Sequence, residues 1–247
     1  MHHTIVVVPC YNEERRFRPG EFPAYLADHP GTRFLLVDDG STDGTLAVLE
    51  ATAAGSPDRI GVLALHPNGG KAEAVRRGML RALEDTPRYV GFWDADLATP
   101  LDAIAPFVEL LDSRPEVAMV FGARVKLLGR RVERRAVRHY LGRVFATAAS
   151  LTLGIPIYDT QCGAKLFRAS EDLAACLAEP FVARWVFDVE LIARALARAR
   201  ARADGGVDSL IVEFPLLEWR DVKGSKVKPI DFLKAGYELA RIAARYR

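Results

Sequence analysis

Short apolar runs alternate with helical patterns along the first half of the chain. The apolar runs are β-branched or continuously hydrophobic, which is typical of strands in a sheet that is covered on both faces. They span 4–9, 33–39, 59–65, 89–96 and 117–123, and the helical patterns between them span 44–54, 71–85 and 101–112. This alternation predicts an α/β fold with a mostly parallel central sheet flanked by helices.

The second half of the chain has a less regular pattern. We expect a helix over 186–201, a strand over 207–216 and a last helix over 231–246. A weakly apolar stretch, 144–157, is either a buried helix or a segment that lies at a membrane surface. Because no internal repeat or low-complexity linker interrupts the chain, we expect a single domain, 1–247.

Composition narrows the classes of function. The chain has 247 residues, of which 50% are hydrophobic and 27% charged, so it can bury a core and disorder is not expected. The net charge of +2 by itself indicates neither a nucleic-acid nor a membrane partner. No stretch reaches the roughly 18–20 apolar residues that span a bilayer.

The cysteines and the N-terminus bear on the compartment. The three cysteines have no metal-ligand spacing, and their odd number favours reduced thiols. The first predicted strand begins without a preceding signal peptide. We therefore expect a soluble or peripheral protein of the cytoplasm.

Polar residues gather where three of the predicted strands end. Ligands of parallel α/β sheets bind beyond the carboxyl ends of the strands. The candidate residues are Pro9, Tyr11 and Glu13 after the first strand, Asp38 and Asp39 at the second, and Asp94 and Asp96 at the fourth.

The stretch GFWDADLATP places Asp94 and Asp96 one residue apart. In an extended segment both carboxylates point to the same side, about 6–7 Å apart, and they repel each other unless a cation lies near them. Mg²⁺ and Mn²⁺ prefer oxygen ligands, and Mg²⁺ often binds one or two carboxylates together with substrate phosphates. We therefore expect this pair to hold Mg²⁺ or Mn²⁺, although a short Asp-x-Asp pattern also occurs by chance.

Two further motifs are weak when taken alone. In HPNGGKAEAV, Lys71 begins a helix after a glycine pair, which suits a phosphate group, but the spacing is not that of a P-loop. VDDGSTDGT, 37–45, contains the residues of an ordinary turn and helix cap as well as those of a binding loop.

The combination of motifs carries more information than any one of them. VVVPCYNEE, LLVDDGSTDGT, NGGKAEAVRRGM and GFWDADLATP, in this order, resemble the inverting family 2 glycosyltransferases of the GT-A fold. DTQCGAKLF, ARWVFDVELIARA and EWRDVKGSKVKP are similar to the C-terminal signature of dolichyl-phosphate β-glucosyltransferases. The resemblance implies metal-dependent transfer of a hexose, with glucose favoured, from a UDP-sugar to a polyprenyl phosphate. It also implies a nucleotide-sugar-binding half, 1–123, and an acceptor-binding half, 124–247.

The resemblance also implies roles for individual residues. The residues that would border the nucleotide or contact its uracil and ribose are Pro9, Tyr11, Glu13, Asp38, Asp39 and Lys71. Asp94 and Asp96 would serve the metal, the ribose and the diphosphate, and Asp96 is the favoured direct metal ligand.

A basic run distinguishes the second half. Residues 124–143 include eight Lys and Arg residues against one acid. Such a run is a solvated face, a nucleic-acid patch or a surface that meets anionic lipid and a lipid phosphate. A single interleaved tyrosine disfavours nucleic acid, and we expect no nucleic-acid partner. We take Arg124 and Arg138 as the first acceptor-phosphate ligands, with Arg143 and Lys226 behind them.

A phosphate acceptor simplifies the expected chemistry. Its second pKa is about 6, so at pH 7 it is largely a dianion and needs no strong base. We expect one in-line displacement at the sugar C1, which turns an α-linked donor into a β-linked product. Asp159 would orient the sugar hydroxyls, act as a base or only cap a turn. Trp185 and Asp188 would line the acceptor pocket, although Trp185 also fits a core position.

Three alternatives remain open at this stage. The first is a soluble family 2 glycosyltransferase with a hydroxyl acceptor, in which Asp159 would be a true base. The second is a nucleotidyltransferase, which can share an α/β sheet and paired aspartates. The third is a non-catalytic basic binding module, which leaves the Asp-Ala-Asp motif unexplained.

Overall fold

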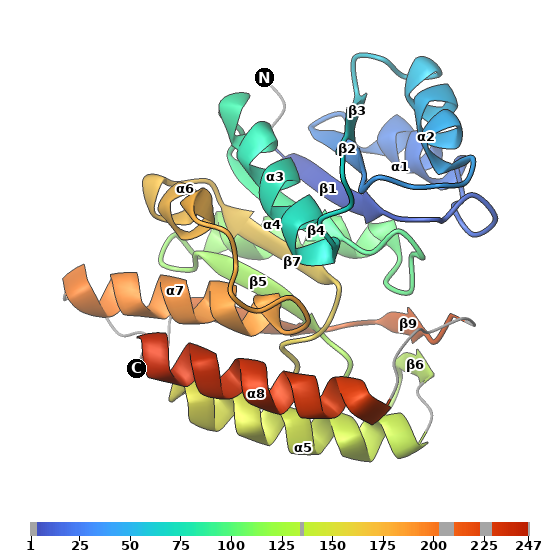
Figure 1. The fold of residues 1–247 in the computed structure, drawn as a ribbon. Coiled ribbons are helices and arrows are strands. Elements are labelled where there is room, and N and C mark those ends of the chain that lie inside the picture. Colours follow the sequence, from blue (N-terminus) through green and yellow to red (C-terminus); the bar gives the residue numbers. More distant parts are fainter. Residues whose placement is uncertain (1–3, 134–135, 203–209, 223–228, 247) are drawn as a thin grey trace.

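The structure is a computed structural model that describes residues 4–133, 136–202, 210–222 and 229–246, without the side chains of residues 133–141 and 229–233. A seven-stranded sheet with the order β3-β2-β1-β4-β7-β5-β8 forms its centre (Figure 1). Its strands are β1 (Thr4–Cys10), β2 (Thr32–Asp38), β3 (Ile60–Ala64), β4 (Tyr89–Trp93), β5 (Met119–Ala123), β7 (Ala164–Arg168) and β8 (Ile211–Pro215). A separate two-stranded ribbon joins β6 (Arg131–Glu133) and β9 (Glu218–Arg220).

The central sheet is mostly parallel, as the sequence predicts. The exception is β7, which is antiparallel to both of its neighbours, β4 and β5. β7 therefore enters the sheet from the opposite direction and brings the residues that precede it, 158–163, to the carboxyl ends of β4 and β5. This strand was not expected from the sequence.

Helices cover both faces of the sheet. They are α1 (Glu21–Asp28), α2 (Thr45–Ala54), α3 (Lys71–Glu84), α4 (Ile104–Ser113), α5 (Ala136–Leu153), α6 (Glu171–Ala178), α7 (Phe187–Arg202) and α8 (Pro229–Tyr246), with a 3₁₀ turn, η1 (Leu101–Ala103), before α4. Figure 1 shows α5 and α8 lying side by side below α7.

Alternating side chains of the strands divide the core into two clusters. Val7 and Phe92 pack with α3, α6 and α7, whereas Val6, Val8 and Trp93 pack with α1, α2 and α4. Successive side chains of a strand point to opposite faces of a sheet, so continuously apolar strands are needed where both faces are covered. This is the physical reason why the apolar runs of the first half could be recognised as strands.

Two expected strands differ from the observed ones by three residues or more at one end. The run 89–96 ends as a strand at Trp93, and the N–H of Leu97 closes a turn on the carbonyl of Asp94 at 3.1 Å. The extended geometry expected for Asp94 and Asp96 is therefore wrong, because the chain turns as soon as it leaves the sheet. The strand expected over 207–216 is observed over Ile211–Pro215, and residues 207–209 lie outside the described residues.

The open alternatives for the stretch 144–157 are partly resolved. Up to Leu153 it is the second half of α5, in which Ala149 and Leu153 are buried. Val144 and Leu151 on the same helix are 71% and 69% exposed. The stretch is therefore helical, with one buried and one open face. In the part of the chain that is described, no helix has the length and apolar character to cross a membrane.

Candidate active site

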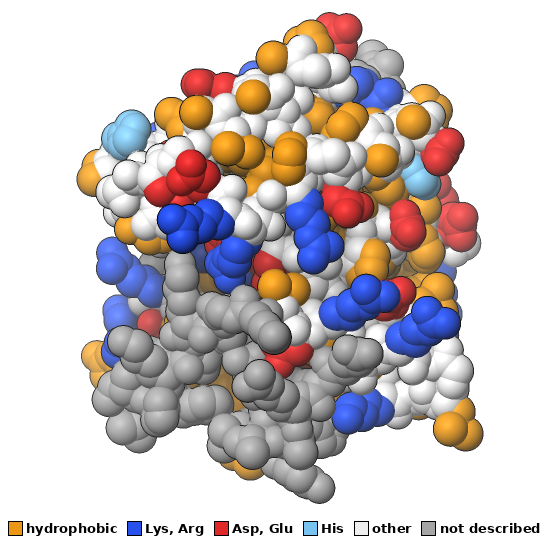
Figure 2. All heavy atoms as spheres, turned by 90° about the vertical axis from the view of Figure 1, so that its right-hand side faces the viewer, with side chains coloured by type: hydrophobic (Ala, Val, Ile, Leu, Met, Phe, Trp, Pro, Cys, Tyr) orange, Lys and Arg blue, Asp and Glu red, His pale blue; other side chains and the backbone are white. Residues whose placement is uncertain are grey.

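A cavity of about 420 Å³ opens beside the carboxyl ends of β4 and β5, near α5 and the start of α7. Eight residues expected from the sequence line it: Lys71, Asp94, Asp96, Arg124, Arg143, Asp159, Trp185 and Asp188. Figure 2 shows the face that lies to the right in Figure 1, where Lys and Arg side chains cross the middle with Asp and Glu among them. The cavity thus combines charges of both signs.

Asp94 directly follows β4, and three neighbours fix its position. Its backbone N–H donates to the carbonyl of Gly163 at 2.8 Å. Gly163 also leaves room for the Asp94 side chain, because a Cβ at that position would lie 1.9 Å from Oδ2. Lys71, the first residue of α3, forms an ion pair with Asp94 Oδ1. Burial opposes the charge of this ammonium group, but the carboxylates of Asp94 and Asp188 outweigh it and raise the pKa of Lys71.

Asp96 lies in the turn that follows Asp94. Its Oδ1 accepts a hydrogen bond from the backbone N–H of Ala98 at 3.0 Å. Burial, and then the charge of Asp94, raise the pKa of Asp96, while the bond from Ala98 and the charges of Lys71 and Arg16 work in the opposite direction. An added positive charge at this pair would relieve the repulsion between the two carboxylates.

Asp39 orders the loop that leads to Lys71. Its Oδ1 accepts from the N–H of Gly69, and its Oδ2 from the N–H of Gly70, each at 2.8 Å. The side-chain amide of Asn68 donates to Oδ2 as well, at 2.9 Å. Asp39 is only 2% exposed, so its carboxylate is committed to this loop.

The other residues expected at the nucleotide lie beside the cavity rather than in its lining. Pro9 belongs to β1, and Tyr11 just after it is 40% exposed. Glu13 forms an ion pair with Arg16, which does line the cavity. Asp38 is almost fully buried; its Oδ2 accepts from a backbone N–H at 3.1 Å, and among the described residues its Oδ1 has no hydrogen-bond partner.

Arg124 and Asp159 form a two-pronged ion pair in the wall of the cavity. The Nε–Oδ2 distance is 2.6 Å and the Nη2–Oδ1 distance is 2.7 Å. Glu213 of β8 fixes the backbone at this point by accepting from the N–H groups of Tyr158 and Asp159 at 2.7 and 2.6 Å. The guanidinium of Arg124 also lies over the ring of Trp219, 5.3 Å from its centroid. Asp159 is therefore the main partner of an arginine that the sequence assigned to the acceptor phosphate.

A second ion pair, between Lys165 of β7 and Asp188 of α7, is almost fully buried. Its Nζ–Oδ1 distance is 2.6 Å, and the two side chains are 1% and 7% exposed. The rings of Phe92 and Phe121 surround the ammonium group at 5.2 and 5.4 Å. Lys165 thus neutralises the charge of Asp188, one of the residues that line the cavity.

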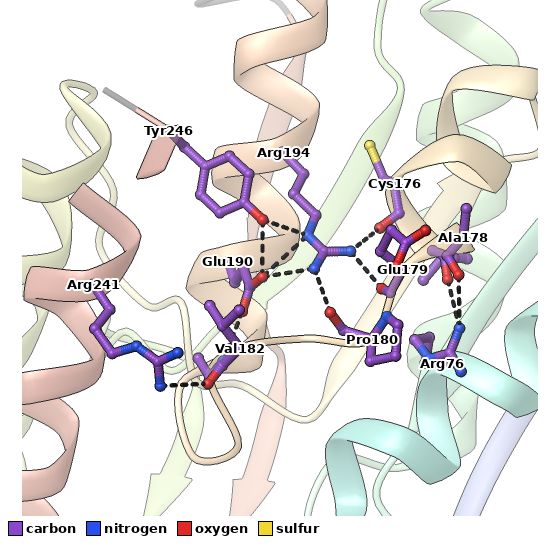
Figure 3. A network of polar contacts seen from close by, with 12 residues as sticks. Arg76, Cys176, Ala178, Glu179, Pro180, Val182, Glu190, Arg194, Arg241 and Tyr246 are labelled. Atoms are coloured by element: carbon purple, nitrogen blue, oxygen red, sulfur yellow. Dashed lines mark hydrogen bonds and ion pairs between the residues drawn. The ribbon is translucent and has the colours of Figure 1, made fainter. Parts of the chain in front are cut away.

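The loop 179–186 brings Trp185 to the cavity and is fixed at both ends. Glu238 of α8 accepts from three successive backbone N–H groups, those of residues 184, 185 and 186, at 3.1, 2.9 and 3.0 Å. At the other end Arg194, paired with Glu190 in α7, donates to the carbonyls of Cys176, Glu179 and Pro180 (Figure 3). The position of Trp185 therefore depends on helices α7 and α8.

The remaining expected residues lie on α5 or beyond it. Arg143 lines the cavity, and its guanidinium stacks on the ring of Tyr158 at 4.0 Å from the centroid. Arg138 belongs to α5, but its side chain is not among those that the structure describes. Lys226 lies outside the described residues.

Comparisons with known proteins show the family of the chain. The family model for "Glycosyl transferase family 2" matches residues 5–173, more than half of the chain. The chain belongs to glycosyl transferase family 2. It is 32% identical to a dolichyl-phosphate beta-glucosyltransferase of Trichomonas vaginalis over 99% of this chain and 72% of the relative. It is 30% identical to a dolichyl-phosphate beta-glucosyltransferase of Saccharomyces cerevisiae over 98% of this chain and 74% of the relative.

Solved structures establish the fold of this family 2 transferase. Glucosyl-3-phosphoglycerate synthase from Mycobacterium tuberculosis, crystallised with Mn²⁺ and UDP-glucose, superimposes with a TM-score of 0.64 at 20% identity. The superposition covers 98% of this chain and 78% of the other. The GT-A fold expected from the sequence is therefore confirmed.

The chemistry of the Asp94–Asp96 pair fits a divalent metal ion. Both side chains offer the oxygen donors that Mg²⁺ and Mn²⁺ prefer. A bound cation would offset the charge of Asp94, which adds to burial in raising the pKa of Asp96. Within the described ranges, no three His, Cys, Asp or Glu side chains gather into a metal-binding group. Mg²⁺ bound by one or two carboxylates usually takes its further ligands from water and substrate phosphates.

Several residues of the site were missed by reasoning from the sequence. The cavity is also lined by Arg16, Arg184 and Trp219, and Lys165 and Glu213 hold its walls from behind. Trp219 lies in EWRDVKGSKVKP and Arg184 in ARWVFDVELIARA, so both motifs could have indicated them. Lys165 lies in DTQCGAKLF, so this motif could have indicated it as well. Glu213 lies in no quoted motif and gave no signal, because a charged residue in a strand pattern is normally assigned to an exposed position.

Proposed function

We propose that this family 2 transferase moves glucose from UDP-glucose to a polyprenyl phosphate of the dolichyl type, with inversion at the sugar C1. The relatives that match nearly the whole chain are dolichyl-phosphate beta-glucosyltransferases. The motifs of the second half, which carry the likeness to that branch, contribute Asp159, Arg184, Trp185, Asp188 and Trp219 to the cavity lining. The chain would use residues 1–123 for the donor and residues 124–247 for the acceptor.

The state of Asp159 carries the proposal for the acceptor. A hydroxyl acceptor needs a base, and Asp159 is the carboxylate that the sequence nominated for that role. Both of its oxygens are bound to Arg124, and a carboxylate that takes a proton in such a pair loses the attraction of its partner. A phosphate acceptor is already an anion at pH 7. The observed pair therefore suits a nucleophile that needs no base.

The residues of the site would divide the remaining work. Lys71, Asp94 and Asp96 would face the diphosphate, with Asp38 and Tyr11 nearer the nucleoside. Mg²⁺ or Mn²⁺ held by Asp94 and Asp96 would supply positive charge for the departing diphosphate. Arg143 and Arg184 line the same cavity and would hold the acceptor phosphate, together with Arg138 and Lys226 of the sequence prediction. Because the positions of nucleophile and leaving group are then fixed, most of the rate gain would come from orientation.

Transfer into an organic phase tests this function directly. The protein is incubated with radiolabelled UDP-glucose, polyprenyl phosphate in detergent, and Mn²⁺ or Mg²⁺, and labelled glycolipid is extracted. We expect label in the lipid, loss of transfer after chelation, and loss of transfer in Asp96→Ala with an unchanged circular-dichroism spectrum. Label that is transferred only to glycans or small hydroxyl compounds would show that the acceptor is a hydroxyl group and not a polyprenyl phosphate. Release of pyrophosphate instead of UDP would show that the enzyme is a nucleotidyltransferase.

The polyprenyl acceptor also requires access to lipid. We place the protein on the cytoplasmic face of a membrane as a peripheral protein, supported by the basic run 124–143 and by the open face of α5 with Val144 and Leu151. Flotation with vesicles that contain anionic lipid tests this placement. A protein that stays at the bottom of the gradient with every vesicle contradicts it.

A further inference from the structure

The connection between β5 and β6 ends in a turn that points leucines into solvent. The N–H of Arg130 donates to the carbonyl of Leu127 at 3.1 Å, and Gly129 has a φ of 79°. A positive φ at the third position of a turn is the role that glycine fills best. The same geometry puts Leu128 at the outer corner, where it is 104% exposed.

A second segment adds to this exposed apolar tip. The N–H of Arg131 donates to the carbonyl of Leu217 at 2.9 Å, so the turn lies beside the connection between β8 and β9. Leu127 is 48% exposed and Leu217 is 60% exposed. A single exposed leucine needs no explanation, whereas several that come together from distant parts of the sequence indicate a surface that meets something apolar.

Basic residues surround the leucines. The stretch RVKLLGRRV, 124–132, has four basic residues and no acid. Arg124 is committed to Asp159, and Lys126 and Arg131 are exposed beside the turn. The acid opposite Arg131, Glu218, forms its ion pair with Arg220 at 2.6 Å. Positive charge around an apolar tip is the combination that binds an anionic lipid surface.

The tip is attached to the cavity from both sides. Its stretch begins at Arg124, and β6, which follows the turn, pairs with β9, which carries Trp219. Arg124 and Trp219 both line the cavity. A membrane surface that binds the tip would therefore lie close to the mouth of the cavity.

We propose that the turn Leu127–Arg130, together with Leu217, inserts into the headgroup region of an anionic membrane and holds the cavity at that depth. This inference rests on the proposed function, because a lipid-linked acceptor presents its phosphate at the headgroup level. We propose anionic lipid as the occupant, because the charges beside Leu127 and Leu128 are basic and anionic headgroups complement them. A second copy of the chain, held by the leucines alone, is the rival occupant.

Vesicle binding of designed variants tests the inference. The measurement is the partition of the full chain to phosphatidylcholine vesicles with and without about 30% phosphatidylserine. Leu127→Ser with Leu128→Ser should lower the partition coefficient by about tenfold or more. Lys126→Gln with Arg131→Gln should lower it by about fivefold for each charge, and only on the anionic vesicles. Tyr237→Ser on α8, where a large apolar side chain is 66% exposed outside the tip, should have a smaller effect than the two leucine substitutions.

The outcomes separate this inference from the proposed function. Transfer to a detergent-solubilised acceptor should be unchanged in the leucine variants, whereas transfer to an acceptor embedded in vesicles should fall with the partition coefficient. Transfer in detergent without any effect of the leucines on vesicle binding refutes the inference and leaves the function standing. Leucine-dependent vesicle binding without transfer refutes the function alone. A dimer in light scattering that the leucine variants convert to a monomer, without vesicle binding, favours the second copy and also refutes the inference.

Discussion

Gly163→Ala should displace one carboxylate of the active site while leaving the fold in place. The added Cβ would lie 1.9 Å from Asp94 Oδ2 and 2.1 Å from its Cγ. Non-bonded heavy atoms settle at about 3.5 Å, so the carboxylate has to move by well over 1 Å. The backbone cannot absorb the shift easily, because the N–H of Asp94 is bonded to the carbonyl of Gly163 itself.

The expected cost differs greatly between activity and stability. A misplacement of about 1 Å in a reacting constellation costs on the order of 100-fold in rate, which corresponds to about 2.7 kcal/mol in the transition state. The atoms that must move are the end of a side chain, and the ion pair with Lys71 joins side chains that are 44% and 33% exposed. Loss of such a pair costs about 1 kcal/mol or less, which lowers Tm by about 2–4 °C for a chain of this size.

Three measurements on Gly163→Ala check this reasoning. We expect the initial rate of transfer to fall about 100-fold, Mn²⁺ binding in the presence of UDP to weaken in an electron paramagnetic resonance titration, and Tm to fall by only a few degrees. Gly236→Ala on α8 is the control, because no atom lies within 4 Å of its added Cβ. Wild-type transfer and Mn²⁺ affinity in Gly163→Ala would refute a role for the position of Asp94. A collapse of Tm would show that the loop, and not the carboxylate, had given way.

Three further perturbations follow from the polar network. Glu238→Ala removes the acceptor for three backbone N–H groups of the loop that carries Trp185. The KM for the acceptor should rise about tenfold with little change for UDP-glucose, and Glu238→Gln, which keeps only one acceptor oxygen, should restore part of the affinity. Lys165→Met leaves Asp188 buried without its cation and should lower the free energy of unfolding in urea by about 3–5 kcal/mol. The double variant Lys165→Met with Asp188→Leu should recover most of this loss. Equal stability of the single and double variants would contradict a buried charge pair. A hydrogen bond from Arg81, first among several partners, lowers the pKa of Asp85, so this carboxylate contributes stability above the unfolded pKa of about 3.9 and loses it as pH falls through the lower folded pKa. The acid limb of the stability curve should therefore be shallower in Asp85→Asn than in the wild type.

Much of the first half could be predicted because its strands are buried on both faces. The runs 4–9 and 117–123 differ from β1 and β5 by only one or two residues at either end. Local pattern could not reveal β7, because the short run AKLF contains a lysine that would be exposed in an ordinary strand. Lys165 is instead 1% exposed, and it is tolerated there because Asp188, which comes from a helix distant in the sequence, lies within 2.6 Å.

The candidate site was predictable to a similar extent. Asp94 and Asp96, expected after β4, line the cavity, as do Asp159, Trp185 and Asp188 from the motifs of the second half. The residues expected after β1 and β2 do not line it. The partners of these residues could not be found in this way. Arg124 binds Asp159, and Asp39 binds the loop of Gly69. Both contacts depend on how loops from different strands meet at one edge of the sheet.

The ion pair of Lys71 offsets part of the negative charge of two neighbouring carboxylates. Burial and the charge of Asp94 both raise the pKa of Asp96, so an uncompensated pair would favour protonation or an open loop. Lys71 compensates Asp94 directly, and Asp188, whose own cation is Lys165, adds to the attraction that raises the pKa of Lys71. A divalent ion that binds Asp94 would then have to share this carboxylate with the lysine or displace it. The repulsion between an incoming cation and Lys71 would be smallest once the diphosphate of a nucleotide sugar neutralises both. The charges of these side chains therefore favour metal and nucleotide binding together over metal binding alone, and Mn²⁺ affinity should be much weaker without UDP than with it.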